Sequence, residues 1–113
     1  MLHTNLKHIE TKAEFEKLLS ENENVMVCCG RMGPMCIPVY AAMTELKEEY
    51  KNVVFADMEF DIPDAAVIRN APEARGFMGL PFTFYYKNGE TVAATSSIQS
   101  KDQIINILDQ QFA

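Results

Sequence analysis

Hydrophobic positions repeat along this chain with two spacings, one typical of strands and one of helices. Two continuous apolar runs, residues 25–29 and 53–56, carry no charge and predict strands that are buried on both faces. Between these runs, apolar residues at positions 39, 43, 46 and 50 are spaced by four, three and four, which predicts one face of a helix over 39–50. A strand, a helix and a second strand in this order indicate a parallel βαβ unit.

Two further helices are predicted from capping sequences. Residues 11–14 (Thr-Lys-Ala-Glu) and 100–103 (Ser-Lys-Asp-Gln) each place a hydroxyl three residues before a Glu or Gln, a pair that satisfies the first free N–H groups of a helix. The first sequence predicts a helix that ends before the polar run at 20–24, and the second a C-terminal helix to residue 112. Residues 2–9 alternate loosely and predict a short edge strand.

The second half of the chain has an antiparallel character. Two β-rich runs, residues 82–86 and 91–95, flank Asn88-Gly89, and Asn-Gly in this setting is the strongest short hairpin signal. Before them, Pro63 precedes a short helix over 64–70. The chain is therefore predicted to be α/β, with a mixed sheet of about five strands and helices on both faces. We expect one domain spanning 1–113.

Composition narrows the classes of partner. The net charge is −6, which argues against nucleic-acid backbones and anionic membranes as partners. No apolar run is long enough to span a membrane, and no signal peptide is recognised at the N-terminus. The three cysteines lie within nine residues and are odd in number, a pattern typical of reduced cytoplasmic thiols rather than of a secreted disulfide framework. We expect a cytoplasmic monomer without metal or cofactor.

All three cysteines lie in the stretch from Cys28 to Val39, which joins the first buried strand to the helix that follows. Cys36 is placed at the start of that helix, where free N–H groups and the helix dipole favour an anion, here a thiolate. Cys36 is therefore the candidate nucleophile. Cys28 is expected to pack in the core.

The order of elements, together with Gly79-Leu80-Pro81-Phe82 and the Asn-Gly hairpin, resembles the thioredoxin family over essentially the whole chain. The resemblance implies the thioredoxin fold, with a cis peptide bond before Pro81 and this proline facing the active-site cysteines. The family's Trp-Cys-Gly-Pro-Cys motif is missing, because the chain has no Trp and no pair of cysteines separated by two residues.

Two placements of the family motif are open. In the first, residues 31–35 lie on it, and both motif cysteines are replaced by methionine. In the second, residues 35–39 lie on it, so that Cys36 is the exposed attacking cysteine, Pro38 is the motif proline and Val39 replaces the resolving cysteine. We favour the second, because it puts a thiol at the helix start and 45 residues before Pro81, close to the family's separation.

The resemblance implies a thiol–disulfide redox protein that acts on protein thiols or disulfides and needs an external reductant. Cys36 is predicted to attack, and Cys29, at the end of the preceding strand, is the candidate resolving thiol if the loop folds back. Met35, Pro38, Leu80 and Pro81 are the predicted substrate contacts. Thioredoxins also carry a buried Asp on the strand before the motif, which is absent here, and residues 57–61 are expected to present a solvated acidic face.

The alternative is a redox-inactive binding module with the same fold. In this hypothesis Met32, Met35 and Met78 form an adaptable apolar rim around Cys36 and Pro81, and the rim binds a partner protein. A monothiol carrier similar to glutaredoxin ranks behind both hypotheses. Whether the protein is an enzyme at all is left open by the sequence.

Overall fold

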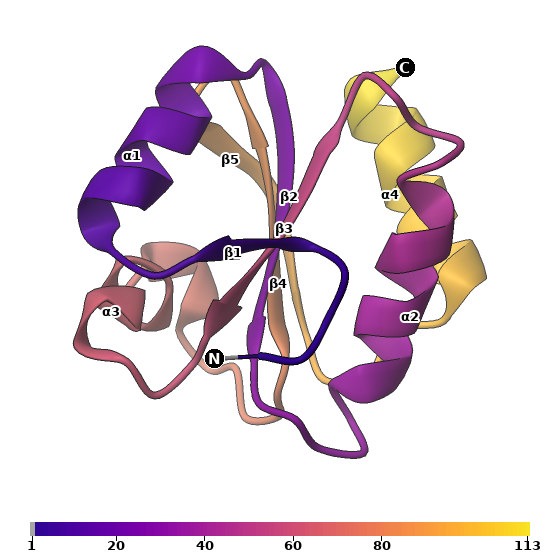
Figure 1. The fold of residues 1–113 in the computed structure, drawn as a ribbon. Helices are drawn as coiled ribbons and strands as arrows, with labels where there is room; N and C mark the ends of the chain where they lie inside the picture. The colour runs from indigo at the N-terminus through magenta and orange to yellow at the C-terminus, as the bar shows by residue number, and fades with distance from the viewer. Residues whose placement is uncertain (1) are drawn as a thin grey trace.

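The computed structural model describes residues 2–113 and contains a five-stranded mixed sheet (Figure 1). The strand order is β1-β3-β2-β4-β5. Strands β1, β3 and β2 are parallel to one another, and β4 is antiparallel to both β2 and β5. The strands are β1 (Lys7–Ile9), β2 (Asn24–Gly30), β3 (Val54–Glu59), β4 (Phe82–Lys87) and β5 (Glu90–Ser96). The sequence prediction of a mixed five-stranded α/β sheet is confirmed.

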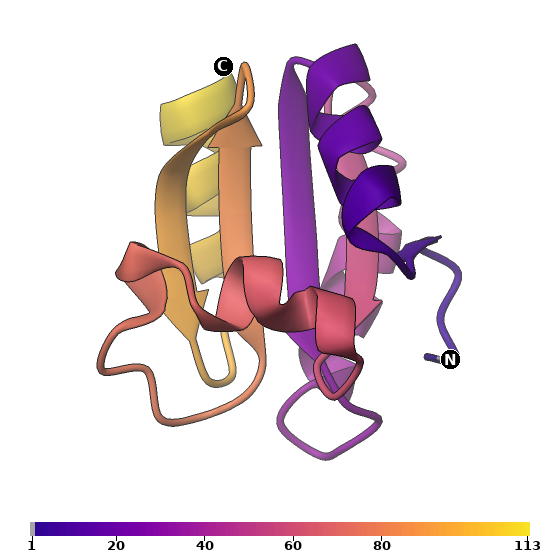
Figure 2. The ribbon, with the colours of Figure 1, turned by 90° about the vertical axis from the view of Figure 1, so that its left-hand side faces the viewer.

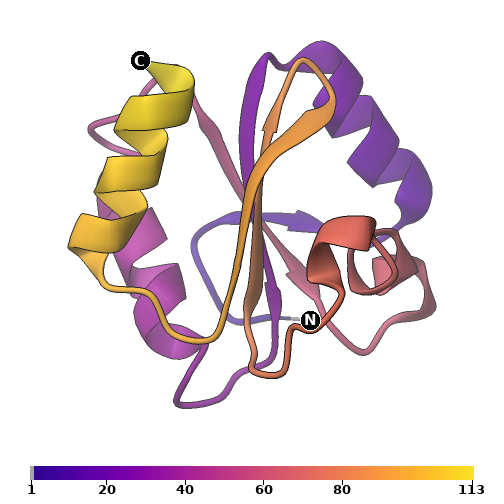
Figure 3. The ribbon, with the colours of Figure 1, turned by 180° about the vertical axis from the view of Figure 1, so that it is seen from behind.

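Four α-helices cover the two faces of this sheet. In Figures 1 and 3, α1 and α3 lie on one face and α2 and α4 on the other, and Figure 2 looks onto the face that α1 and α3 cover. The helices are α1 (Lys12–Glu21), α2 (Ile37–Leu46), α3 (Ala66–Arg69) and α4 (Lys101–Phe112), with single 3₁₀ turns at Pro63–Ala65 and Pro72–Ala74. Both predicted capping boxes are present, at Thr11 and at Ser100.

The sheet separates two hydrophobic cores. Every residue of β2 is buried, and successive side chains of a strand point to opposite faces. Met26 and Cys28 therefore lie in the core beneath α2 and α4, whereas Val25, Val27 and Cys29 lie in the core beneath α1 and α3. This division determines which cysteines can meet.

Three element boundaries differ clearly from the sequence prediction. Strand β1 covers only Lys7–Ile9 of the predicted residues 2–9. Helix α2 begins at Ile37 and ends at Leu46, and residues 47–49 continue as turns. Strand β3 extends to Glu59, because its backbone pairs with β1 on one side and β2 on the other beyond the apolar run. The extension brings Asp57 into the sheet, where it is 1% exposed, so the expectation of a solvated face is wrong for this residue.

The hairpin turn is the one that Asn-Gly predicts. Asn88 and Gly89 both have positive φ, 52° and 82°, the left-handed backbone that a two-residue turn between twisted strands requires. Within residues 2–113, no helix has the length and apolar character needed to cross a membrane.

Strand β4, between β2 and β5, buries a tyrosine hydroxyl that has no hydrogen-bond partner among the described residues. Tyr85 is fully buried in the core beneath α2 and α4, and among the described residues its hydroxyl makes no hydrogen bond. The Tyr85→Phe variant should therefore unfold with a free energy about 1 kcal/mol higher than the wild type, since a buried hydroxyl left unpaired costs roughly that much.

Urea denaturation of the two proteins measures this difference. Tyr50→Phe is the matched control, because the Tyr50 hydroxyl donates to Asp109 Oδ1 at 2.7 Å and the same chemical change should lower stability there. A loss of stability in Tyr85→Phe equal to that in Tyr50→Phe would contradict the account.

Candidate functional site

Three chain segments meet at one end of the sheet. Because β4 runs antiparallel to both β2 and β5, the loop after β2, the segment before β4 and the loop after β5 all lie at the same edge. This edge is the lower end of the molecule in Figure 1. It carries all the large hydrophobic side chains that are exposed among the described residues: Met32, Met35, Ile37, Met78 and Ile98.

Gly30, the last residue of β2, is the point at which the candidate site converges. A Cβ atom at this position would lie 2.7 Å from Cys36 Sγ, 2.8 Å from the Tyr40 hydroxyl oxygen and 3.0 Å from Pro81 Cβ. These distances are shorter than ordinary carbon contacts. The missing side chain of Gly30 thus leaves the space in which the thiol lies beside the proline ring.

Cys36 occupies the N-cap position of α2, as the sequence predicts for the candidate nucleophile. Its side chain makes no capping hydrogen bond, and its sulfur instead accepts a hydrogen bond from the backbone N–H of Arg31 at 3.4 Å. The thiol is only 2% exposed, which corrects the expectation of an exposed attacking cysteine. The physical reason is that the side chain turns back from the helix start toward Gly30 and Pro81.

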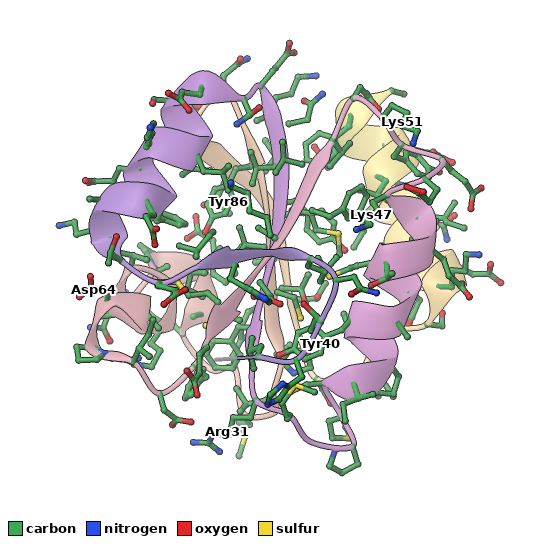
Figure 4. The ribbon with its side chains drawn as sticks, viewed as in Figure 1. Arg31, Tyr40, Lys47, Lys51, Asp64 and Tyr86 are labelled. Atoms are coloured by element: carbon green, nitrogen blue, oxygen red, sulfur yellow. The ribbon has the colours of Figure 1, made fainter. Side chains whose placement is uncertain are left out.

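Arg31 anchors the start of the loop that leads from β2 to Cys36. Its Nε and Nη2 atoms donate to the two carboxylate oxygens of Asp61 at 2.7 and 2.8 Å, and its guanidinium lies 5.4 Å from the centre of the Phe60 ring. The hydrogen bond from Arg31 lowers the pKa of the Asp61 carboxyl. Arg31 extends from the lower end of the molecule in Figure 4, with Tyr40 above it.

The structure does not bring Cys29 to Cys36. Cys29 lies in the core beneath α1 and α3, whereas Cys36 and Cys28 lie in the core beneath α2 and α4. The expectation that Cys29 pairs with Cys36 is therefore corrected, because the strand carries the Cys29 side chain to the far face of the sheet. All three cysteines are free thiols.

The predicted substrate contacts lie at the same edge but differ in exposure. Pro81 is buried and its peptide bond with Leu80 is cis, the form that the resemblance implies. Leu80 is half-buried and packs against both cores. Met35 is exposed, and Pro38 is an exposed residue of the first turn of α2 that lines a shallow groove with Ile98.

A buried carboxylate, Asp57, lies near the cysteines on β3, where the sequence predicted only solvent-exposed acidic side chains. Asp57 on β3 is the register neighbour of Cys28 on β2, and it accepts a hydrogen bond from the Thr4 hydroxyl and contacts His8 Nδ1 at 2.6 Å. Burial raises the pKa of Asp57, an effect that the hydrogen bonds from Thr4 and His8 partly oppose. The only sequence signal was its position directly after an apolar run.

Tyr40 is a second residue of the site that the sequence reading missed. Tyr40 lies in the first turn of α2 and its side chain is buried. Its hydroxyl donates to the carbonyl oxygen of Arg31 at 3.2 Å. Burial raises the pKa of Tyr40, so the phenol stays protonated and acts as a hydrogen-bond donor beside the Cys36 sulfur. Its helical spacing from Ile37 and Met43 gave no sign of this role.

Burial raises the pKa of the two strand cysteines. The pKa of Cys29 is raised to about 12, chiefly by burial, and burial also raises the pKa of Cys28 well above its ordinary value. Both therefore remain thiols at neutral pH. Among residues 2–113, no three His, Cys, Asp or Glu side chains gather in an arrangement that could hold a metal ion.

The space at Gly30 gives a direct prediction for stability. In Gly30→Ala the new methyl group collides with Cys36, Tyr40 and Pro81, and the free energy of unfolding should fall by about 1–3 kcal/mol, the usual cost of overpacking. Gly33→Ala is the control, since a Cβ there meets no atom within 4 Å. Equal stability of the two variants in urea denaturation would show that the site is not packed as described.

The burial of Asp57 predicts a pH dependence of stability. Because its pKa is raised in the folded protein, the folded state binds the proton more tightly, and this residue's contribution to the free energy of unfolding falls as pH rises above about 4. Asp57→Asn removes the titration. The stability of the wild type minus that of Asp57→Asn should therefore decrease as pH rises above about 4, and an increase would refute the assignment.

Comparison with known proteins gives matches at the level of structure alone. No protein-family model matches the chain, and no curated protein sequence matches it. Among solved structures, Plasmodium falciparum thioredoxin is similar with a TM-score of 0.74 and 24% identity, over 96% of this chain and 100% of that chain.

Two plant-lineage structures are similar to the same extent. Chlamydomonas reinhardtii thioredoxin f2 gives a TM-score of 0.78 at 18% identity, over 96% of this chain and 97% of its own. Arabidopsis thaliana thioredoxin O2 in its oxidized state gives 0.75 at 14% identity, over 99% and 98%. The chain therefore has the thioredoxin fold, as its sequence predicts.

Proposed function

We propose that this protein is a thiol–disulfide exchange protein whose reacting group is Cys36. One observation carries the proposal: the Cys36 sulfur lies beside Pro81 at the position that Gly30 leaves open, and the Arg31 N–H donates a hydrogen bond to it. A donor directed at sulfur stabilises a thiolate more than a thiol. The solved thioredoxin structures of similar fold favour this chemistry over an unrelated one.

The exchange begins with attack on a partner's disulfide. The Cys36 thiolate forms a bond to one partner sulfur, the partner's S–S bond breaks, and the second partner sulfur leaves as a thiolate that takes up a proton. A second thiol then releases the mixed disulfide, and an external thiol or a dithiol protein supplies the reducing equivalents. Since Cys29 faces the other core, it does not serve as the resolving thiol.

The burial of Cys36 and the exposed apolar side chains at this end of the sheet indicate which class of partner segment can react. Because the thiol is 2% exposed, a partner reaches it only when the chain around it moves aside. The exposed Met35 and the almost fully exposed Met78 (96%) lie in the loops at the same end of the sheet and offer adaptable apolar contacts. An extended, apolar polypeptide segment around the partner's disulfide is therefore the favoured substrate class.

A second function, a binding module without redox turnover, is favoured by a separate observation. The large exposed hydrophobic side chains of the described chain gather at this one edge while the thiol beneath them is covered. Apolar surface concentrated in this way marks a protein-binding face. In this case a partner binds at the rim and Cys36 is a buried core residue.

Trapping of a mixed disulfide decides between the two functions. The reduced protein is mixed with a disulfide-linked apolar peptide, quenched with acid and weighed by mass spectrometry. At the earliest quench times we expect an adduct on the wild type and on the control variant Cys29→Ser, and none on Cys36→Ser. Adduct formation by Cys36→Ser at the wild-type rate would exclude Cys36 as the reacting group. If neither the wild type nor the variants form an adduct but all of them bind the reduced peptide, the binding module is established.

A further inference from the structure

Cys28 has surroundings that a simple core residue does not need. Only three polar or charged residues are buried among the described residues, and two of them, Asp57 and Thr83, are the register neighbours of Cys28 on either side. The Thr83 hydroxyl donates to the Cys28 sulfur at 3.9 Å. Buried polar groups are costly in a core, so a pair of them beside one thiol calls for a chemical reason.

Cys28 also lies on the face of the sheet that Cys36 reaches. Cys28 and Gly30 are two residues apart on β2, and their Cβ directions therefore point to the same face. The Cys36 sulfur lies 2.7 Å from the position that a Cβ atom on residue 30 would occupy. Cys28 and Cys36 also belong to the same core cluster. Positions 28 and 30 are about 6.7 Å apart along the strand, and this spacing sets the scale of the movement that would bring the two thiols together.

Few polar contacts hold the Cys36 side chain at its present position. It makes no capping hydrogen bond, and the contact that holds its sulfur is the long 3.4 Å hydrogen bond from Arg31. The first turn of α2 is held by backbone bonds to the Gly33 carbonyl, 3.1 Å from the Cys36 nitrogen and 3.0 Å from that of Ile37. A bond between the two sulfurs therefore requires a rotation of the Cys36 side chain and a shift of this turn, which carry the sulfur from Gly30 toward Cys28.

We infer that Cys28 is the resolving thiol of Cys36, so that the site is a dithiol with seven residues between its cysteines. This inference rests on the proposed function. After Cys36 forms a mixed disulfide, Cys28 attacks the Cys36 sulfur, the bond between Cys36 and the partner breaks, and a Cys28–Cys36 disulfide forms. The partner sulfur leaves with the proton that Cys28 gives up. The protein thereby loses two electrons to the partner, and an external dithiol later returns them.

The order of the two steps agrees with the burial of the thiols. Burial raises the pKa of Cys28, so it stays protonated in the reduced protein and does not compete with Cys36 for the partner's disulfide. The Thr83 hydroxyl opposes this effect and stabilises the negative charge that develops on Cys28 during attack. Asp57, on the other side of Cys28, leads to His8, whose side chain is 24% exposed.

Disulfide mapping of the oxidised protein tests the inference. The reduced wild type is oxidised with diamide, remaining thiols are alkylated, and the protein is cut with trypsin. Cleavage at Lys17, Arg31 and Lys47 puts Cys28 and Cys29 on one peptide (18–31) and Cys36 on another (32–47). We expect these peptides to be disulfide-linked, with fragmentation between positions 28 and 29 locating the alkyl group on Cys29.

Two variants make the outcome unambiguous. Cys29→Ser should form the linked peptides as the wild type does, and Cys28→Ser should lose them and accumulate the mixed disulfide with the model peptide. Cys28→Ala repeats the test if the serine is not tolerated in the core. A linkage through Cys29, or Cys36 adducts that never resolve internally in the wild type, would overturn this inference and leave the proposed function intact. Absence of a Cys36 adduct in the wild type and in Cys28→Ser alike, with no linked peptides, would instead overturn the proposed function.

Discussion

The candidate site depends on the lack of a side chain at Gly30. Strand β2 must end where helix α2 begins to approach the sheet, and at that point three groups occupy the space that a Cβ would need. Cys36 comes from the helix start, Tyr40 from its first full turn, and Pro81 from the segment before β4. A single glycine therefore permits a thiol, a phenol and a buried proline to meet.

The same strand also sorts the cysteines. Because successive side chains of β2 point to opposite faces, Cys28 faces the core beneath α2 and α4, and Cys29 faces the core beneath α1 and α3. The sheet thus decides which thiol has access to Cys36. Asp57 and Thr83 on the neighbouring strands then make the surroundings of Cys28 polar within an otherwise apolar core.

The sequence was sufficient to predict the fold because its local signals agree. Uncharged apolar runs, two capping boxes and Asn88-Gly89 all point to the same mixed sheet, and the structure contains each of them. The site was harder to predict. Which face Cys29 occupies depends on the exact register of β2, and the burial of Asp57 depends on β1 pairing far from it in sequence. Neither contact leaves a local pattern.

The central claim is that Cys36, which lies beside Gly30 and Pro81, is the reacting thiol. The most direct test of this claim measures the order in which the three cysteines react. The native reduced protein is treated with less than one equivalent of an aromatic disulfide, and the labelled peptides are followed over time by mass spectrometry. The account predicts that label enters peptide 32–47, at Cys36, before it enters peptide 18–31. Label that enters peptide 18–31 first, at Cys28 or Cys29, would contradict it.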